Sequence, residues 1–307
     1  MKRGALIGLN LSGFLSLAGV AQATENPPVG LPTAGGIDLQ PPATPIMAEI
    51  REFHGFLLPI IVAISVFVLV LLLWVTIRYN RRANPTPRKF THNMLVEVIW
   101  TVVPVLILVA IAWKSFPLLF REERVPATAE LTLKVTGNQW FWQYEYPDQH
   151  VSVTSLLMPE ADVNAYNQQH TGQEQKIYLL STTAPIVVPM DTDVRVLITS
   201  NDVIHSWAVP AFGVKEDATQ GRVNDTWFHI DSHMVGPGDH TFFGQCSELC
   251  GKDHAYMPIE IRAVTREEFN QWLAQQGGTL AFGAAPPAAG PAAAPAAGPA
   301  PAQTPTR

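Results

Sequence analysis

The hydrophobic residues of this chain are concentrated in three blocks that lie before residue 121. The first covers residues 5–20. The second, 56–77, carries no charged residue and is long enough to cross about 30 Å of hydrocarbon. The third covers about 94–120, with Glu97 near its start and Lys114 near its end. Beyond it, the hydrophobic positions form short alternating runs, which are typical of β-strands. The whole pattern therefore predicts a membrane-anchored chain with a β domain.

The first block has the pattern of a secretory signal peptide. Lys2 and Arg3 precede the apolar stretch, and the small residues Ala21 and Ala23 provide a cleavage site. A short membrane anchor is the alternative, but the block is followed at once by a polar stretch rich in Pro and Gly. The sequence therefore predicts a signal peptide over 1–23, a mature chain that begins near Thr24, and an exported segment over 24–54.

The second and third blocks predict a transmembrane hairpin over residues 55–120, with helices over about 55–79 and 94–120. Positively charged loops stay on the cytoplasmic side of a membrane. The basic residues between the helices are Arg78, Arg81, Arg82, Arg88 and Lys89. The loop over 80–93 is therefore expected to be cytoplasmic, with both ends of the hairpin on the outer side. A buried hairpin of a soluble protein would not explain the uncharged length.

The alternating runs after residue 129 predict strands of a β-sandwich or barrel over 121–275. The runs are 131–136, 176–180, 194–199, 226–230 and 240–243. A helix is expected over 265–274, with Thr265 and Glu268 as a capping box. Residues 276–307 are rich in Ala and Pro and are expected to form a disordered tail that buries no core.

The charge is distributed unevenly along the chain. The whole chain has a net charge of −6, but residues 121–262 contain 19 Asp and Glu against nine Lys and Arg. An acidic exported domain would attract a basic partner over long range. Plain solubility accounts for the same charge, so that composition alone does not choose between the two.

Both cysteines of the chain lie in one short segment with other soft or nitrogen donors. Cys246, Cys250, His254 and Met257 are spaced Cys-x3-Cys-x3-His-x2-Met. Thiolate, thioether and imidazole groups together suit copper that transfers electrons. His205, just after a predicted strand, is expected to supply the second imidazole.

The cysteine pair has two other interpretations. A disulfide is chemically reasonable in an oxidising compartment, but it would close a very small loop and leave the spacing of His254 and Met257 unexplained. A single blue-copper ion needs only one cysteine, so that one thiol would be spare. Two copper ions bridged by both sulfurs use the whole set.

The segment from Gln245 to Pro258 resembles the copper A loop of cytochrome c oxidase subunit II, and the hairpin with a β domain also resembles that family. The resemblance implies an all-β cupredoxin-like Greek-key barrel after the two-helix hairpin. It implies two copper ions held by the side chains of His205, Cys246, Cys250, His254 and Met257. It further implies that Glu248 contributes its backbone carbonyl, and that its side chain reaches a magnesium or manganese ion shared with subunit I.

The same resemblance implies roles for two residues outside the loop. Trp140, the first tryptophan of an aromatic strand over 139–146, would receive electrons from cytochrome c above the copper. Core packing is the plainer interpretation for its neighbours Phe141 and Tyr144. Glu97, with His92 nearby, would mark the mouth of a proton channel into subunit I. A carboxylate paired with the basic loop at the membrane surface is the alternative for Glu97.

The resemblance also implies a location and partners. These are a bacterial inner membrane with the copper domain in the periplasm, a haem–copper subunit I, a subunit III, and a cytochrome c docked on acids such as Glu145, Asp148 and Asp202. Two related functions stay open: the copper A subunit of a nitric oxide reductase, and a copper-free oxidase scaffold, which lacks the cysteines. A copper chaperone is disfavoured because five buried ligands would hold the metal too tightly.

Overall fold

The computed structural model describes residues 29–33, 35–86, 89–171 and 175–282. The predicted signal peptide and most of the predicted tail lie outside this range.

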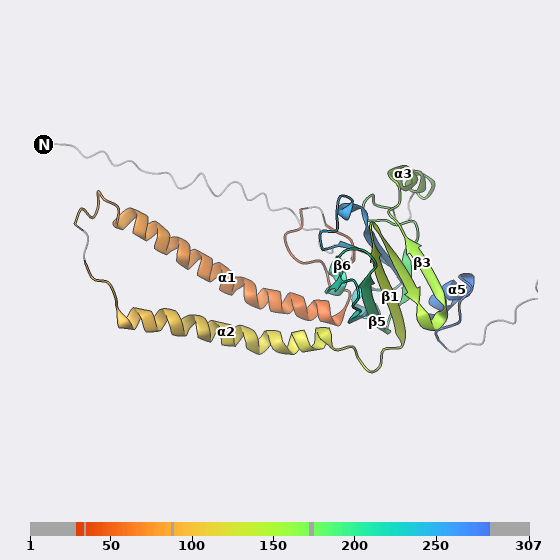
Figure 1. Cartoon of the computed structure of the whole chain (residues 1–307), viewed down its shortest axis with the longest axis horizontal. Coiled ribbons are helices and arrows are strands. Elements are labelled where there is room, and N and C mark those ends of the chain that lie inside the picture. Colours follow the sequence, from red (N-terminus) through yellow and green to blue (C-terminus); the bar gives the residue numbers. More distant parts are fainter. Residues whose placement is uncertain (1–28, 34, 87–88, 172–174, 283–307) are drawn as a thin grey trace, which may run out of the picture.

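Two long helices, α1 (Pro45–Arg78) and α2 (Met94–Glu123), form an antiparallel hairpin that projects from one side of the β domain (Figure 1). Both have the length and apolar composition of membrane-spanning helices, and the apolar side chains of the spans are mostly exposed. Such a surface is stable only in lipid or against other membrane helices. The predicted transmembrane hairpin is confirmed by this arrangement.

The first helix begins at Pro45 rather than near residue 55. Its start is fixed by Thr44, whose side-chain oxygen caps the helix by accepting a hydrogen bond from the Met47 amide at 3.0 Å. The same hydroxyl donates to the carbonyl of Phe212 at 2.7 Å. Met47 is buried where it contacts Gly213 of the β domain. The extra turns therefore attach the hairpin to the domain, a tertiary role that the hydrophobicity pattern does not reveal.

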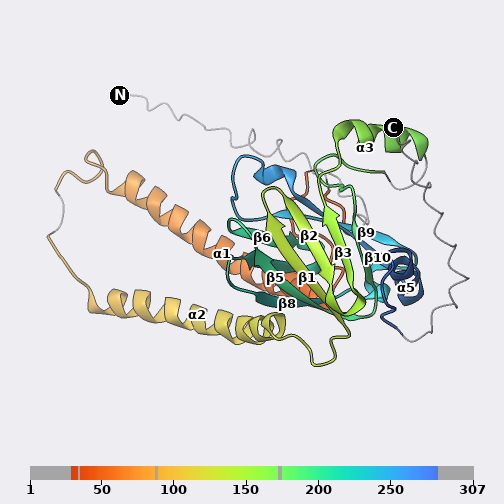
Figure 2. The ribbon, with the colours of Figure 1, turned by 45° about the vertical axis from the view of Figure 1, so that its right-hand side comes forward.

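The domain after the hairpin is a sandwich of two five-stranded sheets. The first has the order β3-β2-β1-β5-β8 (Figure 2). The second has the order β4-β10-β9-β6-β7. β1 pairs with β5, and β4 with β10, in parallel, and the other pairs are antiparallel. The strands are β1 (Leu131–Asn138), β2 (Phe141–Tyr146), β3 (Val151–Ser155), β4 (Ile186–Pro189), β5 (Asp193–Ser200), β6 (His205–Val209), β7 (Val214–Ala218), β8 (Asn224–His229), β9 (His240–Cys246) and β10 (Pro258–Val264).

In the described part of the domain, three α-helices accompany the sheets: α3 (Glu160–Gln169), α4 (Ser232–Val235) and α5 (Arg266–Gln275). The capping box of α5 is present as predicted, with Thr265 and Glu268 bonded to each other's backbone. The chain stays packed beyond the predicted end of the domain at residue 275. The side-chain oxygen of Asn270 accepts hydrogen bonds from the Ala281 and Phe282 amides, at 3.1 and 3.2 Å. The folded part therefore extends through residue 282.

The core between the sheets is built from alternating aromatic and branched side chains. On β2, Trp142, Tyr144 and Tyr146 are fully buried, whereas Phe141 lies on the opposite face and is only half-buried. Because side chains alternate between the faces of a strand, residues 142, 144 and 146 share the inner face. The expectation of a core position is therefore confirmed for Tyr144 and wrong for Phe141.

The segment 176–180, predicted as a strand, is a turn in the structure. The amides of Leu180 and Ser181 both donate to the carbonyl of Ile177, at 3.1 and 2.8 Å. The segment follows α3, a helix that the sequence analysis missed because its polar, Asn- and Gln-rich sequence has little apolar periodicity. Lys176 does not extend along a sheet but pairs with Glu260 of β10.

Candidate metal centre

The two thiols lie next to each other where β9, the central strand of the second sheet, ends. Cys246 ends β9, and Cys250 follows in the loop that leads to β10. Both side chains are buried and free, and their sulfur atoms are 3.9 Å apart. Cys246 and Cys250 therefore do not form the disulfide that is the alternative interpretation of the sequence.

Strand pairing brings His205 to the cysteines from 41 positions earlier in the chain. β6 begins at His205 and pairs with β9, so that Trp207 lies opposite Cys246. The imidazole ring of His205 is fully buried, and its Nδ1 atom lies 3.8 Å from the Cys246 sulfur. The imidazole nitrogen of His205, the sulfur of Cys246 and the sulfur of Cys250 all lie within 4.8 Å of one another.

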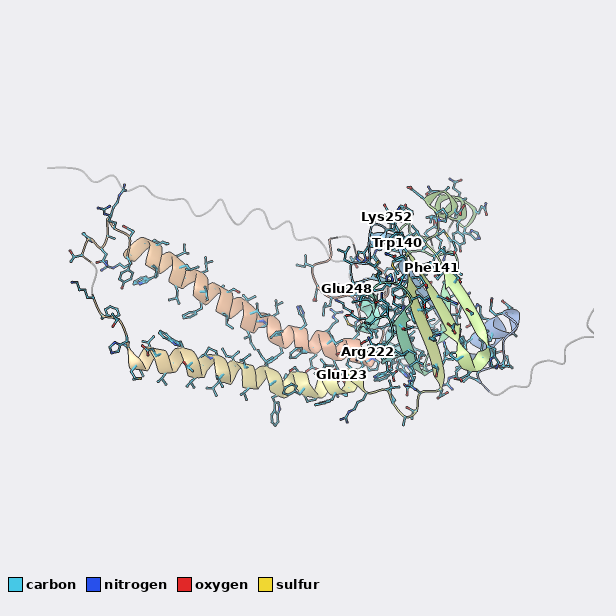
Figure 3. The ribbon with its side chains drawn as sticks, viewed as in Figure 1. Glu123, Trp140, Phe141, Arg222, Glu248 and Lys252 are labelled. Carbon is cyan, nitrogen blue, oxygen red and sulfur yellow. The ribbon has the colours of Figure 1, made fainter. Side chains whose placement is uncertain are left out.

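The other predicted donors surround the same pair of sulfurs. The Nδ1 atom of His254 and the sulfur of Met257 each lie 3.5 Å from the sulfur of Cys250. The backbone carbonyl of Glu248 lies 3.3 Å from the sulfur of Cys246. All six predicted residues therefore contribute an atom to one cluster. The carboxylate of Glu248 belongs to an exposed side chain on the side of the domain that faces the hairpin (Figure 3).

Two neighbours fix the orientation of the His205 ring. Its Nε2 atom bonds to Asp202 at 2.8 Å, which leaves Nδ1 directed at the thiols. A side chain at Gly137 would place its Cβ only 2.7 Å from the ring. The absence of a side chain at position 137 is therefore a requirement of the site.

Trp142 of the core packs against the cluster. Its ring lies edge-on to His205 with centroids 5.8 Å apart, and its indole N–H donates to the carbonyl of Met257 at 3.2 Å. One rigid core residue thus contacts two of the predicted ligands. Ligands held by packed neighbours keep their positions when the charge of the site changes.

The electrostatics of the two thiols are unequal. Burial would raise the pKa of Cys246, but its hydrogen bond with His205 is among those that lower this pKa below the usual thiol value. Burial raises the pKa of Cys250, and the charge of the Cys246 thiolate raises it further. Without a cation, the pair would favour only one thiolate. Two thiolates at this separation require positive charge between them, which a bound metal supplies.

The donor set fits soft copper ions. Two thiols, one thioether and two imidazoles are the ligand types of copper sites that transfer electrons. Metal–thiolate bonds are about 2.3 Å long in zinc sites, and one ion bonded to both sulfurs at a similar length fits a separation of 3.9 Å. Because both thiols face the same cluster, a mononuclear site that uses one cysteine would leave the other unexplained.

Trp140 lies beside the cluster, half-buried, in the turn between β1 and β2 rather than within a strand. Its indole N–H donates to the carbonyl of Cys250 at 3.2 Å. The side-chain amide of Gln139 donates to the same carbonyl at 2.8 Å. A direct hydrogen bond therefore connects this partly exposed ring to the residue that carries one of the thiols.

Glu97 lies far from the cluster, at the start of α2. Asn93 caps this helix, and the Glu97 carboxylate accepts a hydrogen bond from the Asn93 amide at 3.2 Å. The side chain therefore has a structural role at the helix start. His92 lies next to this cap, with its ring nitrogen 3.2 Å from the Thr91 hydroxyl.

Of the acids expected on a docking surface, two are already engaged. Glu145 pairs with Lys134 at 2.9 Å, and Asp202 is bonded to His205. The sequence analysis missed this role of Asp202, although its position three residues before a predicted ligand was a usable signal. It also missed Gly137 and Gln139, whose roles depend on contacts between strands.

These features define a β-sandwich with a candidate metal site, joined to a hairpin of two long apolar helices. The family profile described as "Cytochrome C oxidase subunit II, periplasmic domain" matches residues 131–264, and the one described as "Cytochrome C oxidase subunit II, transmembrane domain" matches residues 32–118. The chain belongs to the cytochrome c oxidase subunit II family.

Two relatives identified by sequence agree with this assignment. The chain is 42% identical to "Cytochrome c oxidase subunit 2" of Cereibacter sphaeroides, over 88% of this chain and 90% of the relative. It is 47% identical to "Probable cytochrome c oxidase subunit 2" of Rickettsia bellii, over 80% and 85%. A crystal structure of the periplasmic domain of subunit II of cytochrome oxidase from Bradyrhizobium japonicum is 44% identical and covers 50% of this chain and 97% of that one, with a TM-score of 0.41.

Proposed function

We propose that this chain is the electron-accepting subunit of a cytochrome c oxidase, with a binuclear copper A centre as its resident cofactor. It receives electrons from a cytochrome c and delivers them to the haem–copper subunit I, which reduces oxygen to water coupled to proton pumping. The observation that carries the proposal is the convergence of two free thiols, two imidazoles and a thioether on one buried cluster. The bound copper pair supplies a one-electron redox change.

The protein's own residues hold and surround this cofactor. Cys246 and Cys250 would supply the two thiolates, and His205, His254, Met257 and the Glu248 carbonyl would complete the ligand set. Packing against Trp142 keeps the donors in place, which limits their rearrangement when an electron arrives. No described group near the cluster is arranged to break a covalent bond, so that oxygen chemistry is assigned to subunit I.

Trp140 is assigned to electron acceptance and the exposed Glu248 carboxylate to a magnesium or manganese ion shared with subunit I. Glu97 is assigned to the mouth of a proton channel into subunit I, in addition to its role at the helix start. The family membership and the apolar hairpin support insertion in a bacterial inner membrane with the β domain in the periplasm, beside subunits I and III.

The purified complex tests this proposal directly. We expect two copper ions per chain at this site, near-infrared absorption, and an electron spin resonance signal of one electron shared by two copper nuclei. Cys246→Ser should abolish these signals. A preparation with a native disulfide between the cysteines and no copper would contradict the proposal and favour a scaffold role.

Trp140→Phe tests the route of electrons separately. It keeps an aromatic ring but removes the hydrogen bond to Cys250, and Trp140→Ala removes both. Because electron transfer depends on positioning, we expect cytochrome c oxidation to fall by about 10²-fold in the alanine variant, with copper spectra retained. Normal turnover in Trp140→Ala would exclude this residue as the acceptor.

A further inference from the structure

A lysine lies directly over the proposed electron acceptor. The ammonium of Lys252 is 5.7 Å from the centre of the Trp140 ring, within the range of a cation–π contact. Figure 3 shows both residues at the same end of the β domain. Trp140 is half-buried, and the Lys252 side chain is 79% exposed, so that a docking protein that reaches the ring meets the ammonium first.

The local backbone sets this arrangement. Gly251 has φ +122°, and a Cβ at this position would lie 3.0 Å from the Trp140 ring. The loop therefore passes close against the indole before the chain reaches Lys252. Because the indole is also bonded to Cys250, the ring and the ligand loop form one unit with the lysine at its outer edge.

The charge of Lys252 opposes the charge of the surrounding domain. Residues 121–262 contain 19 acidic and nine basic side chains, which attract a basic protein over long range. The Lys252 ammonium, in contrast, places a positive charge over Trp140, the residue that the electron donor is proposed to approach most closely. Its ion pair with Asp253 is 3.6 Å long and exposed, so that it is screened and weak.

We propose that Lys252 determines which electron donors this subunit accepts. It disfavours a cytochrome c with a lysine at the centre of its contact face, and it favours a donor with a neutral or acidic group there, within a basic rim. Charges at an interface act mainly through association rate and partner choice. The inference rests on the proposed function, in which Trp140 receives the electron.

The test uses the whole oxidase complex with Lys252→Gln and Lys252→Glu. The donor is a lysine-rich cytochrome c, with kcat/KM measured from low to high ionic strength. We expect kcat/KM at low salt to rise about threefold for Lys252→Gln and about tenfold for Lys252→Glu, since a charge change at an interface alters association strongly at low salt. The difference should vanish at high salt, where charges are screened.

The matched control is Arg195→Gln. It removes one positive charge from an exposed ion pair with Asp225, toward the opposite end of β5 from the metal centre. We expect this variant to change kcat/KM by less than the Lys252 variants at every salt concentration. A rise as large as that of Lys252→Gln would show that net charge alone is responsible and would overturn the proposal.

Two further measurements separate the inference from the function on which it rests. Reduction by N,N,N′,N′-tetramethyl-p-phenylenediamine, a small donor that is uncharged at neutral pH and has no protein contact face, should be equally fast in wild type and Lys252→Gln, with an unchanged copper midpoint potential. A shifted potential together with a salt-independent change in rate would overturn the role in partner choice. If no donor reduces a copper centre in the wild type, the proposed function itself fails.

Discussion

The carboxylate of Asp202 binds the outer nitrogen of His205 at 2.8 Å, and it also accepts the backbone amide of Gln139 at 2.6 Å. One side chain therefore connects a proposed metal ligand, His205, to the residue that precedes Trp140. Burial would raise the pKa of Asp202, but these hydrogen bonds lower the pKa below its usual value. The Asp202 carboxylate is therefore negatively charged, and it positions the His205 ring in addition to contributing charge to the surface.

Asp202→Ala should weaken metal binding. The change leaves the outer nitrogen of His205 without its acceptor, so that the ring loses its fixed orientation. Removal of such a partner typically costs about 10–100-fold in metal affinity, which competition with a chelator would measure. In Asp202→Asn the amide oxygen can still accept from His205, but its nitrogen faces the Gln139 amide, so that an intermediate loss is expected. Equal affinity in all three proteins would contradict this role.

Gly137→Ala should displace the His205 ring. The new Cβ would lie 2.7 Å from the ring, a separation that requires the ligand or β1 to shift. We expect copper content to fall and the copper absorption to change, with the β domain still folded. Gly244→Ala, whose Cβ would meet the Ala208 carbonyl at 2.1 Å, is a harsher comparison that should destabilise the sheet itself.

Met257→Leu should keep the fold and change the copper centre. The side chain is almost fully buried, and replacement by a group of similar volume costs less than about 1.5 kcal/mol. Loss of the thioether removes an electron-donating ligand, so that the midpoint potential should rise and transfer to subunit I should slow. Redox titration and turnover check this. Unchanged spectra and turnover would remove Met257 from the ligand set.

Lys176→Met should destabilise the β domain. It leaves the Glu260 carboxylate, which is 1% exposed, without its cation. Removal of one partner of a buried ion pair costs about 3–5 kcal/mol, and the 20% exposure of Lys176 favours the lower end. Lys134→Met breaks the exposed pair with Glu145 and should cost at most about 1 kcal/mol. Denaturant unfolding of the two variants compares these values.

Asp191→Asn should alter the pH dependence of stability. Burial would raise the pKa of Asp191, but hydrogen bonds with Ser232 and the charges of His229 and His233 lower it overall. A lowered folded-state pKa stabilises the protein above the unfolded value of about 3.9, and this contribution is lost as the pH falls through the folded value.

Asparagine tolerates the positive φ of 52° at position 191, so that the substitution mainly removes charge. The urea midpoints of wild type and variant should therefore differ above about pH 4 and converge below about pH 3. A constant difference across this range would show that the charge of Asp191 does not contribute.

The amino-acid sequence was sufficient to predict the hairpin and the donor groups that meet at the candidate metal centre. An uncharged run such as 56–77 has only one stable environment, because lipid is the solvent that accepts so many exposed apolar side chains. Cys246, Cys250, His254 and Met257 lie within one short segment. Their proximity therefore follows from their spacing in the sequence. The capping box at Thr265 is local in the same way and was predicted correctly.

Features that depend on contacts between distant segments could be seen only in the tertiary structure. The distance from His205 to Cys246, the bond from Asp202 to Gln139 and the space that Gly137 leaves all arise from strand pairing, which no short pattern encodes. The segment 176–180, expected to be a strand from its alternating pattern, is not a strand in the structure, and there Lys176 pairs with Glu260 of β10, 84 positions later in the chain. The local propensity of a short segment does not reveal such a long-range contact.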